Sequence, residues 1–66
     1  MDDSGTIGTA IRAARKEARI TQEVLAELAG LSERTVRSIE AGAGTSSLAA
    51  VAAAANAVGL HLTAVA

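Results

Sequence analysis

Apolar residues recur at helical spacing through most of this 66-residue chain, and turn-forming residues divide the pattern into segments. Positions three and four apart lie on one face of a helix, so each apolar stripe predicts an amphipathic helix. The predicted helices cover residues 6–19, 22–29, 33–41 and 46–58. The last segment, residues 60–65, alternates with period two and predicts a short strand.

The stripes supply a candidate core, and small polar residues supply N-caps. Thr6, Thr21 and Ser32 each precede a stripe, where a side-chain oxygen can accept a hydrogen bond from an unpaired backbone N–H. Gly30 stands where the second helix needs a left-handed residue to end it. The residues expected to face inward are Ile7, Ala10, Ile11, Ala14, Ala18, Val36, Ile39, Leu48, Val51, Ala52, Ala55 and Val58.

The length allows a single small domain, with a flexible tail over residues 1–5 and a helical domain over residues 6–59. Domains of this size are marginally stable, and without cysteine the chain gains no disulfide, so oligomerisation is the expected support. One strand alone leaves its backbone groups unpaired. We therefore expect two copies to pair residues 60–66 in an antiparallel ribbon. The dimerisation residues would be Leu60, His61, Leu62, Thr63, Ala64 and Val65.

Net charge is −1, but all positive charge is concentrated in one part of the chain. The six basic residues are Arg12, Arg15, Lys16, Arg19, Arg34 and Arg37. The first four follow helical spacing and predict a basic stripe, which is either a solvated face or a surface for nucleic acid.

Composition argues against several function classes. The chain has no cysteine, one histidine and scattered carboxylates, so we expect no enzyme activity, metal site or cofactor. No apolar stretch is long enough to suggest a membrane span. The acidic start lacks the basic and apolar regions of a signal peptide, so we expect a cytoplasmic protein.

Residues 21–42 carry the most specific pattern. Two short helices joined by a brief turn containing glycine form a helix-turn-helix unit, whose second helix lies in the DNA major groove. Arg15 and the order of the motifs TQE, AGLS and IEAG make the chain resemble the Xre/Cro-repressor type of helix-turn-helix protein over about residues 7–60. The ending GLHLTAV is similar to the HipB-like antitoxin branch. The implied fold is all-α and lambda-repressor-like, with four to five short helices and a C-terminal strand that pairs across a dimer.

The resemblance also implies roles by position. Gln22 would bond a DNA phosphate, and Arg15 and Glu40 would form a structural salt bridge. The residues that would face the groove are Ser32, Glu33, Arg34, Thr35 and Ser38.

Base chemistry sharpens two of these roles. Arg34 suits guanine, and Glu33 can accept from cytosine. Arg37 is either a phosphate or base contact, or the partner of Glu33 in a weak ion pair four residues apart. Further candidate phosphate contacts are Lys16, Arg19 and Thr45.

Two features depart from the family pattern. The loop over residues 43–47 carries no charge where lysine or arginine is usual, which predicts weaker non-specific DNA affinity. Val24 and Leu28 are apolar where polar residues are common, and we expect them to form a partner surface. An outward alanine face is expected on the fourth helix, although the high helix propensity of alanine explains it equally well. Its members are Ala49, Ala50, Ala53, Ala54 and Ala57.

These observations favour a homodimeric repressor that binds a palindromic operator in double-stranded DNA. The HipB-like ending extends this to an antitoxin that regulates its own operon and neutralises a HipA-like kinase toxin. One alternative is a stand-alone phage-like or housekeeping repressor without a toxin. Another is a protein-interaction module with little DNA binding, which the near-neutral charge and the uncharged loop favour.

Overall fold

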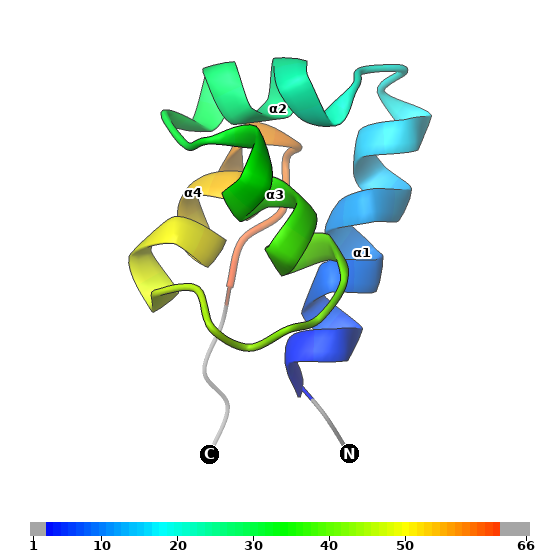
Figure 1. The fold of residues 1–66 in the computed structure, drawn as a ribbon. Coiled ribbons are helices and arrows are strands. Elements are labelled where there is room, and N and C mark those ends of the chain that lie inside the picture. The colour runs from blue at the N-terminus through cyan, green and yellow to red at the C-terminus, as the bar shows by residue number, and fades with distance from the viewer. Residues whose placement is uncertain (1–2, 63–66) are drawn as a thin grey trace.

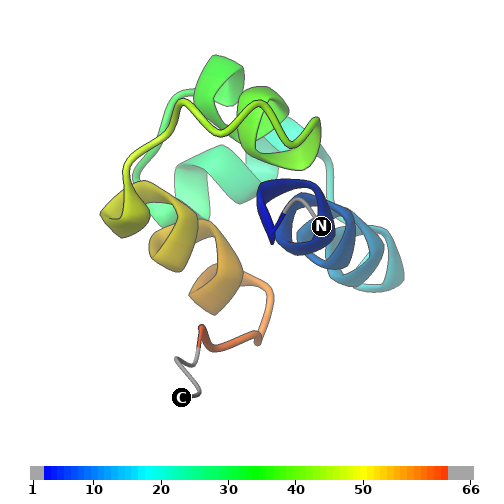
Figure 2. The ribbon, with the colours of Figure 1, turned by 90° about the horizontal axis from the view of Figure 1, so that it is seen from below.

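The structure, a computed structural model, describes residues 3–62, with side chains from residue 5 onward. Within this range the chain forms four helices and no strand, in agreement with the helical part of the expected fold. In chain order they are α1 (Asp3–Glu17), α2 (Gln22–Ala29), α3 (Glu33–Glu40) and α4 (Leu48–Ala57). In Figure 1, α2 crosses the top, α1 and α4 lie on opposite sides below it, and α3 lies in front. The view from below shows α3 and the following loop along one side of α1 and α4 (Figure 2).

The core is small and aliphatic, and all four helices contribute to it. Ile11, Leu25 and Val36 are fully buried, each on a different helix. Burying a side chain of this size stabilises a fold by about 1.5–3 kcal/mol. From α4 the buried residues are Ala54 and Ala55, whose small size lets this helix lie close to the others. The core therefore has few large side chains, and each of them carries a large share of the stability.

Gly8 allows α1 to pack tightly against the end of α3. A Cβ atom at this position would overlap the carbonyl oxygen of Ile39 and press against that of Glu40. Glycine inside a helix costs about 1 kcal/mol relative to alanine, and here the close approach of two backbones requires it. The sequence interpretation missed this residue. A lone glycine within a helical pattern was the available signal.

The first helix starts and ends earlier than its predicted span. Residues 3–5 belong to α1 rather than to a tail, so Thr6 lies inside the helix and is not its N-cap. At the other end, Arg19 adopts a left-handed φ of 61° just after the helix. Its N–H donates to the Lys16 carbonyl at 3.0 Å, which closes the last turn.

The buried face of α1 also differs from the prediction. Ala10 and Ala18 are exposed, whereas they were expected to point inward. The face that meets α3 instead runs through Gly8, Ile11 and Arg15, which are buried. Their spacing of three and four residues is helical, but glycine and arginine do not mark an apolar stripe.

Of the five alanines predicted to form an outward face on α4, only Ala49 is exposed. Ala54 is fully buried, and Ala50 and Ala57 also pack against the core. Leu48, predicted to be a core residue, is 76% exposed. The reason is that α4 begins only at Leu48, after the N-cap Ser47, and lays its small residues against the other helices. In a helix made largely of alanine, hydrophobicity cannot indicate which side faces inward.

The chain after α4 forms no strand in the described range, which ends at Leu62. Leu60 packs against the core, and its N–H donates to the Ala55 carbonyl at 2.8 Å. Leu60, predicted as a dimerisation residue, thus also packs within the single chain. His61 and Leu62 are exposed, and the other predicted pairing residues, Thr63, Ala64 and Val65, lie outside the described residues. Strand pairing across a dimer stays a prediction.

Candidate nucleic-acid interface

The turn between α2 and α3 is built from capped helix ends. Gly30 adopts a left-handed φ of 70°, and the Leu31 N–H returns to the Ala26 carbonyl at 2.9 Å. Thr21 and Ser32 are N-caps, as predicted, because their hydroxyl oxygens accept from the backbone three residues ahead, both at 3.1 Å. Thr21 fixes where α2 begins, whereas Gly30 and Ser32 fix where α2 ends and α3 begins.

The third helix divides into a buried and an outward side. Val36, Ile39 and Glu40 are buried, and they anchor α3 to the core. The predicted groove-facing residues occupy the other side. Exposed among them are Ser32, Glu33 and Arg34, and half-buried are Thr35 and Ser38. Arg37, predicted as a phosphate or base contact, is also exposed. A short helix with one anchored face can present its charged face to a major groove.

A polar depression joins α3 to the start of α4. Arg34, Thr35, Ser38 and Thr45 line it, together with Ser46 and Ser47. The structure thus brings Thr45, a candidate phosphate contact, next to three groove-facing residues. Hydroxyl groups and one arginine suit phosphate oxygens, and the depression lies at the N-terminus of α4.

Arg15 and Glu40 form an ion pair that links α1 to α3. Arg15 Nε donates to Glu40 Oε2 at 2.7 Å, and Nη2 donates to Oε1 at 3.0 Å. The remaining nitrogen, Nη1, donates to the Ile20 carbonyl at 2.9 Å. The hydrogen bond with Glu40 raises the pKa of Arg15 against the opposing effect of burial, so the guanidinium stays charged. Arg15 is buried in this network. It therefore does not belong to the exposed basic stripe predicted for α1.

Gln22 belongs to the same network. Its Nε2 donates to Glu40 Oε1 at 3.2 Å, and the side chain is half-buried. The predicted phosphate contact of Gln22 is untested, but its amide is held by α3 rather than free to rotate. Gln22, Glu40 and Arg37 line one depression.

Two predicted phosphate contacts lie outside these depressions. Lys16 and Arg19 are exposed and line neither of the two polar depressions. Within residues 5–62, the one ion pair closer than 4 Å is Arg15–Glu40, so the alternative pair of Glu33 with Arg37 does not form.

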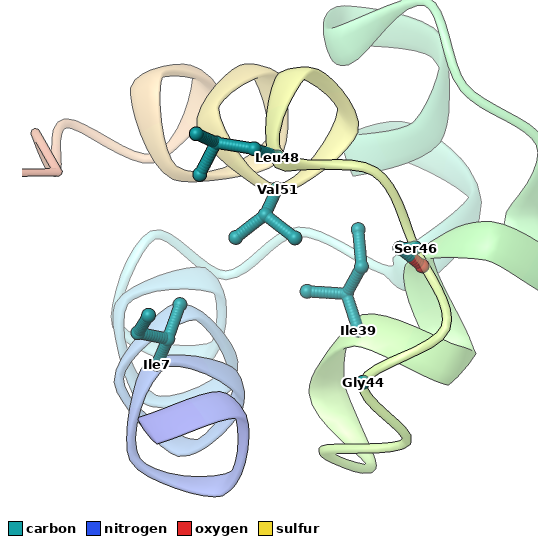
Figure 3. A pocket seen from close by; sticks show the side chains of 6 residues that line it. All are labelled: Ile7, Ile39, Gly44, Ser46, Leu48 and Val51. Carbon is teal, nitrogen blue, oxygen red and sulfur yellow. The ribbon is translucent and has the colours of Figure 1, made fainter.

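The apolar side chains expected at the surface are there. Val24 and Leu28 are 38% and 63% exposed, one turn apart on α2. A separate apolar pocket of about 210 Å³ lies between α1, α3 and α4. Figure 3 shows Ile7, Ile39 and Val51 reaching into it from the three helices. No charged side chain lines this pocket, so it is not part of the surface for phosphate.

In the described part of the chain, no cluster of three or more histidine, cysteine or carboxylate residues is placed to hold a metal ion. None of the helices within residues 3–62 has the length and hydropathy of a membrane-spanning segment.

Comparison with known proteins gives a family match. The sequence pattern of the family described as "Helix-turn-helix" matches residues 11–65, most of the chain. No curated protein matches the sequence. The matched region contains α2, the glycine turn and α3, so the family match and the geometry point to the same unit, that of a DNA-binding transcription regulator.

Proposed function

We propose that this chain, which belongs to the helix-turn-helix family, is a repressor that reads a specific sequence in double-stranded DNA. The observation that carries the proposal is the outward face of α3. Glu33 and Arg34 are exposed in its first turn, while Val36 and Ile39 anchor its other face in the core. The first turn of a recognition helix is the part that meets base edges.

The two exposed charges suit different bases. Arg34 can donate two hydrogen bonds to O6 and N7 of guanine, and Glu33 can accept one from N4 of cytosine. Each well-made contact of this kind discriminates against a wrong base by about 1–3 kcal/mol. Neither side chain is held by an ion pair within the described residues, so DNA does not have to break one.

A single domain with one short recognition helix reads only a few base pairs. We propose that two copies bind together, which makes the operator palindromic and places its half-sites about 34 Å apart. Residues 60–65 remain the proposed dimer contact, with Leu60 shared between the core and the interface. A dimer bound across a promoter would block transcription.

Selection of binding sites from a random duplex pool tests this proposal. The full chain is incubated with the pool, bound DNA is recovered, and the enriched sequences are compared. We expect a palindrome with one G·C pair at the same place in each half-site. Enrichment of no common sequence would contradict sequence-specific binding and favour the protein-interaction alternative.

A second function, neutralisation of a toxin, draws on the exposed side chains of α2. Val24 and Leu28 together offer an apolar surface, and such surfaces on small proteins mark binding sites. We propose this surface for a protein partner such as a HipA-like kinase, which would make the repressor an antitoxin.

Co-purification from the native host tests the toxin partner. We expect a kinase-like chain to accompany the wild type and to be lost from the double variant Val24→Ser, Leu28→Ser. The double variant should bind DNA as the wild type does. If no second chain accompanies the wild type, the stand-alone repressor is the better description.

A further inference from the structure

Arg12 received no individual role from the sequence, yet it lines a depression together with residues from two other helices. The depression has a volume of about 390 Å³, and its lining residues are Arg12, Gln22, Arg37, Glu40 and Ala41. Arg12 comes from α1, Gln22 begins α2, and Arg37 lies on α3. Residues far apart in sequence thus bring two guanidinium groups and one amide to a single open site.

The charge of this depression is positive. Glu40 lies in it, but both carboxylate oxygens are engaged by Arg15, whose charge cancels that of Glu40. Arg12 and Arg37 are exposed, and neither has an ion-pair partner within the described residues. Two uncompensated positive charges therefore remain, and an anion between them would remove their repulsion.

Gln22 adds a directed donor to the same site. An amide group carries two N–H bonds, and Gln22 gives one to Glu40 Oε1 at 3.2 Å. Since a carboxylate only accepts, this bond sets which end of the amide is the nitrogen. The second N–H is left for another oxygen acceptor.

We propose that Arg12 and Arg37 join Gln22, for which the family resemblance already implies a phosphate contact, in binding one phosphate group of the DNA backbone. Arginine binds phosphate in a fixed, forked geometry, which suits a site with two guanidinium groups. The proposal rests on the proposed DNA binding. It makes Arg12 a DNA contact, and it assigns Arg37 to the backbone instead of a base.

The position of Arg37 on α3 favours a phosphate of DNA over a free anion. Arg37 follows Glu33 and Arg34 by about one turn of the helix. If the first turn of α3 contacts the bases of a duplex, the backbone of that duplex lies near the next turn, which carries Arg37. Backbone contacts fix the register of the recognition helix without reading sequence. The site would therefore hold α3 in place while Arg34 reads a base.

The salt dependence of DNA affinity tests the proposal. Affinities of the wild type, Arg12→Gln, Arg37→Gln and the double variant are measured on operator and random duplexes from 50 to 200 mM salt. Losing one phosphate contact lowers the salt slope by about 0.9, so a fourfold rise in salt costs a variant about 3.5-fold less affinity than it costs the wild type. We expect equal losses on both duplexes.

The double variant decides whether the two arginines share a phosphate. If they do, each single variant keeps one guanidinium on the phosphate and its slope changes little, whereas the slope of the double variant falls by about 0.9. A fall of about 0.9 in each single variant and of about 1.8 in the double variant would contradict a shared phosphate. Arg34→Gln is the control, because it should weaken operator binding more than random binding. Unchanged slopes in Arg12→Gln, Arg37→Gln and the double variant would overturn the proposal and leave the DNA-binding function intact.

A titration with inorganic phosphate separates the two claims. The side-chain amide signals of Gln22 and the Nε–H signals of the arginines are followed by NMR in the full chain. We expect them to shift with phosphate in the wild type and not in the double variant. If the wild type binds neither duplex but these shifts occur, the depression is an anion site and the proposed DNA binding fails. Absence of shifts together with unchanged salt slopes would show that the depression does not bind phosphate.

Discussion

Arg15 and Glu40 are joined by two hydrogen bonds, of 2.7 and 3.0 Å, across 25 residues of chain. Their side chains are only 11% and 3% exposed. Taking charges out of water is costly, and such a pair is stable only while both members are present and well bonded. The pair fixes α1 against α3, and through Gln22 it also holds the start of α2. Glu40 therefore connects α3 with both α1 and the start of α2.

Substitution of Glu40 tests the contribution of this pair to stability. Glu40→Gln keeps the shape but leaves Arg15 buried without a counter-charge, so the free energy of unfolding should fall by about 3–5 kcal/mol. Urea denaturation followed by circular dichroism measures it. Glu27→Gln, at an exposed position on α2, is the control and should change stability by less than about 0.5 kcal/mol. Superimposable curves for Glu40→Gln and the wild type would show that the pair is not needed for stability.

Gly8 tests the packing of α1 on α3. Gly8→Ala should destabilise the fold by about 1–3 kcal/mol, because the added methyl group meets backbone carbonyls that cannot move independently. Helix propensity alone predicts the opposite, a gain of about 1 kcal/mol. Thr9→Ala, on the exposed side of the same turn, isolates the propensity effect and should raise the thermal midpoint slightly. A stabilised Gly8→Ala variant would mean that the helices are further apart than described.

Arg34 tests the assignment of a base contact. Arg34→Ala should relax the preference at one symmetric pair of operator positions by about 1–3 kcal/mol and largely spare binding to random DNA. Affinities for a set of single-base operator variants measure this. Equal losses on operator and random duplexes would instead make Arg34 a backbone contact.

Removal of the last four residues tests the dimer. Ending the chain after Leu62 keeps Leu60 and its bond to Ala55 in place, so the domain should still fold. We expect sedimentation to show a monomer and operator affinity to fall steeply. A shortened chain that sediments as a dimer would move the interface elsewhere, for example to the exposed Leu48 beside the apolar pocket.

The helix-turn-helix unit was predictable because its signals are local. Caps such as Thr21 and Ser32, and a glycine that must be left-handed, act within a few residues of their own position. The packing of α4 was not predictable in this way. Ala54 and Ala49 are chemically identical, and only the positions of the other helices decide that one is buried and the other exposed.

Part of the candidate site also depended on the tertiary arrangement. Arg12 looked like any member of a basic stripe, and only the crossing of α1 with α3 places it beside Arg37. The pairing of Arg15 with Glu40 came from family resemblance, since nothing in a single sequence relates positions 25 residues apart. Gly8 gave a signal, but its meaning depends on which backbone lies opposite.

The central claim is that α3 reads DNA sequence, and a competition titration tests it most directly. The full chain is titrated into a labelled duplex that carries the palindrome recovered by selection, at fixed salt, with unlabelled random or identical duplex as competitor. We predict that the identical duplex competes at least a thousandfold better than the random one, as specific binding requires. Equal competition by the two duplexes would contradict sequence-specific recognition.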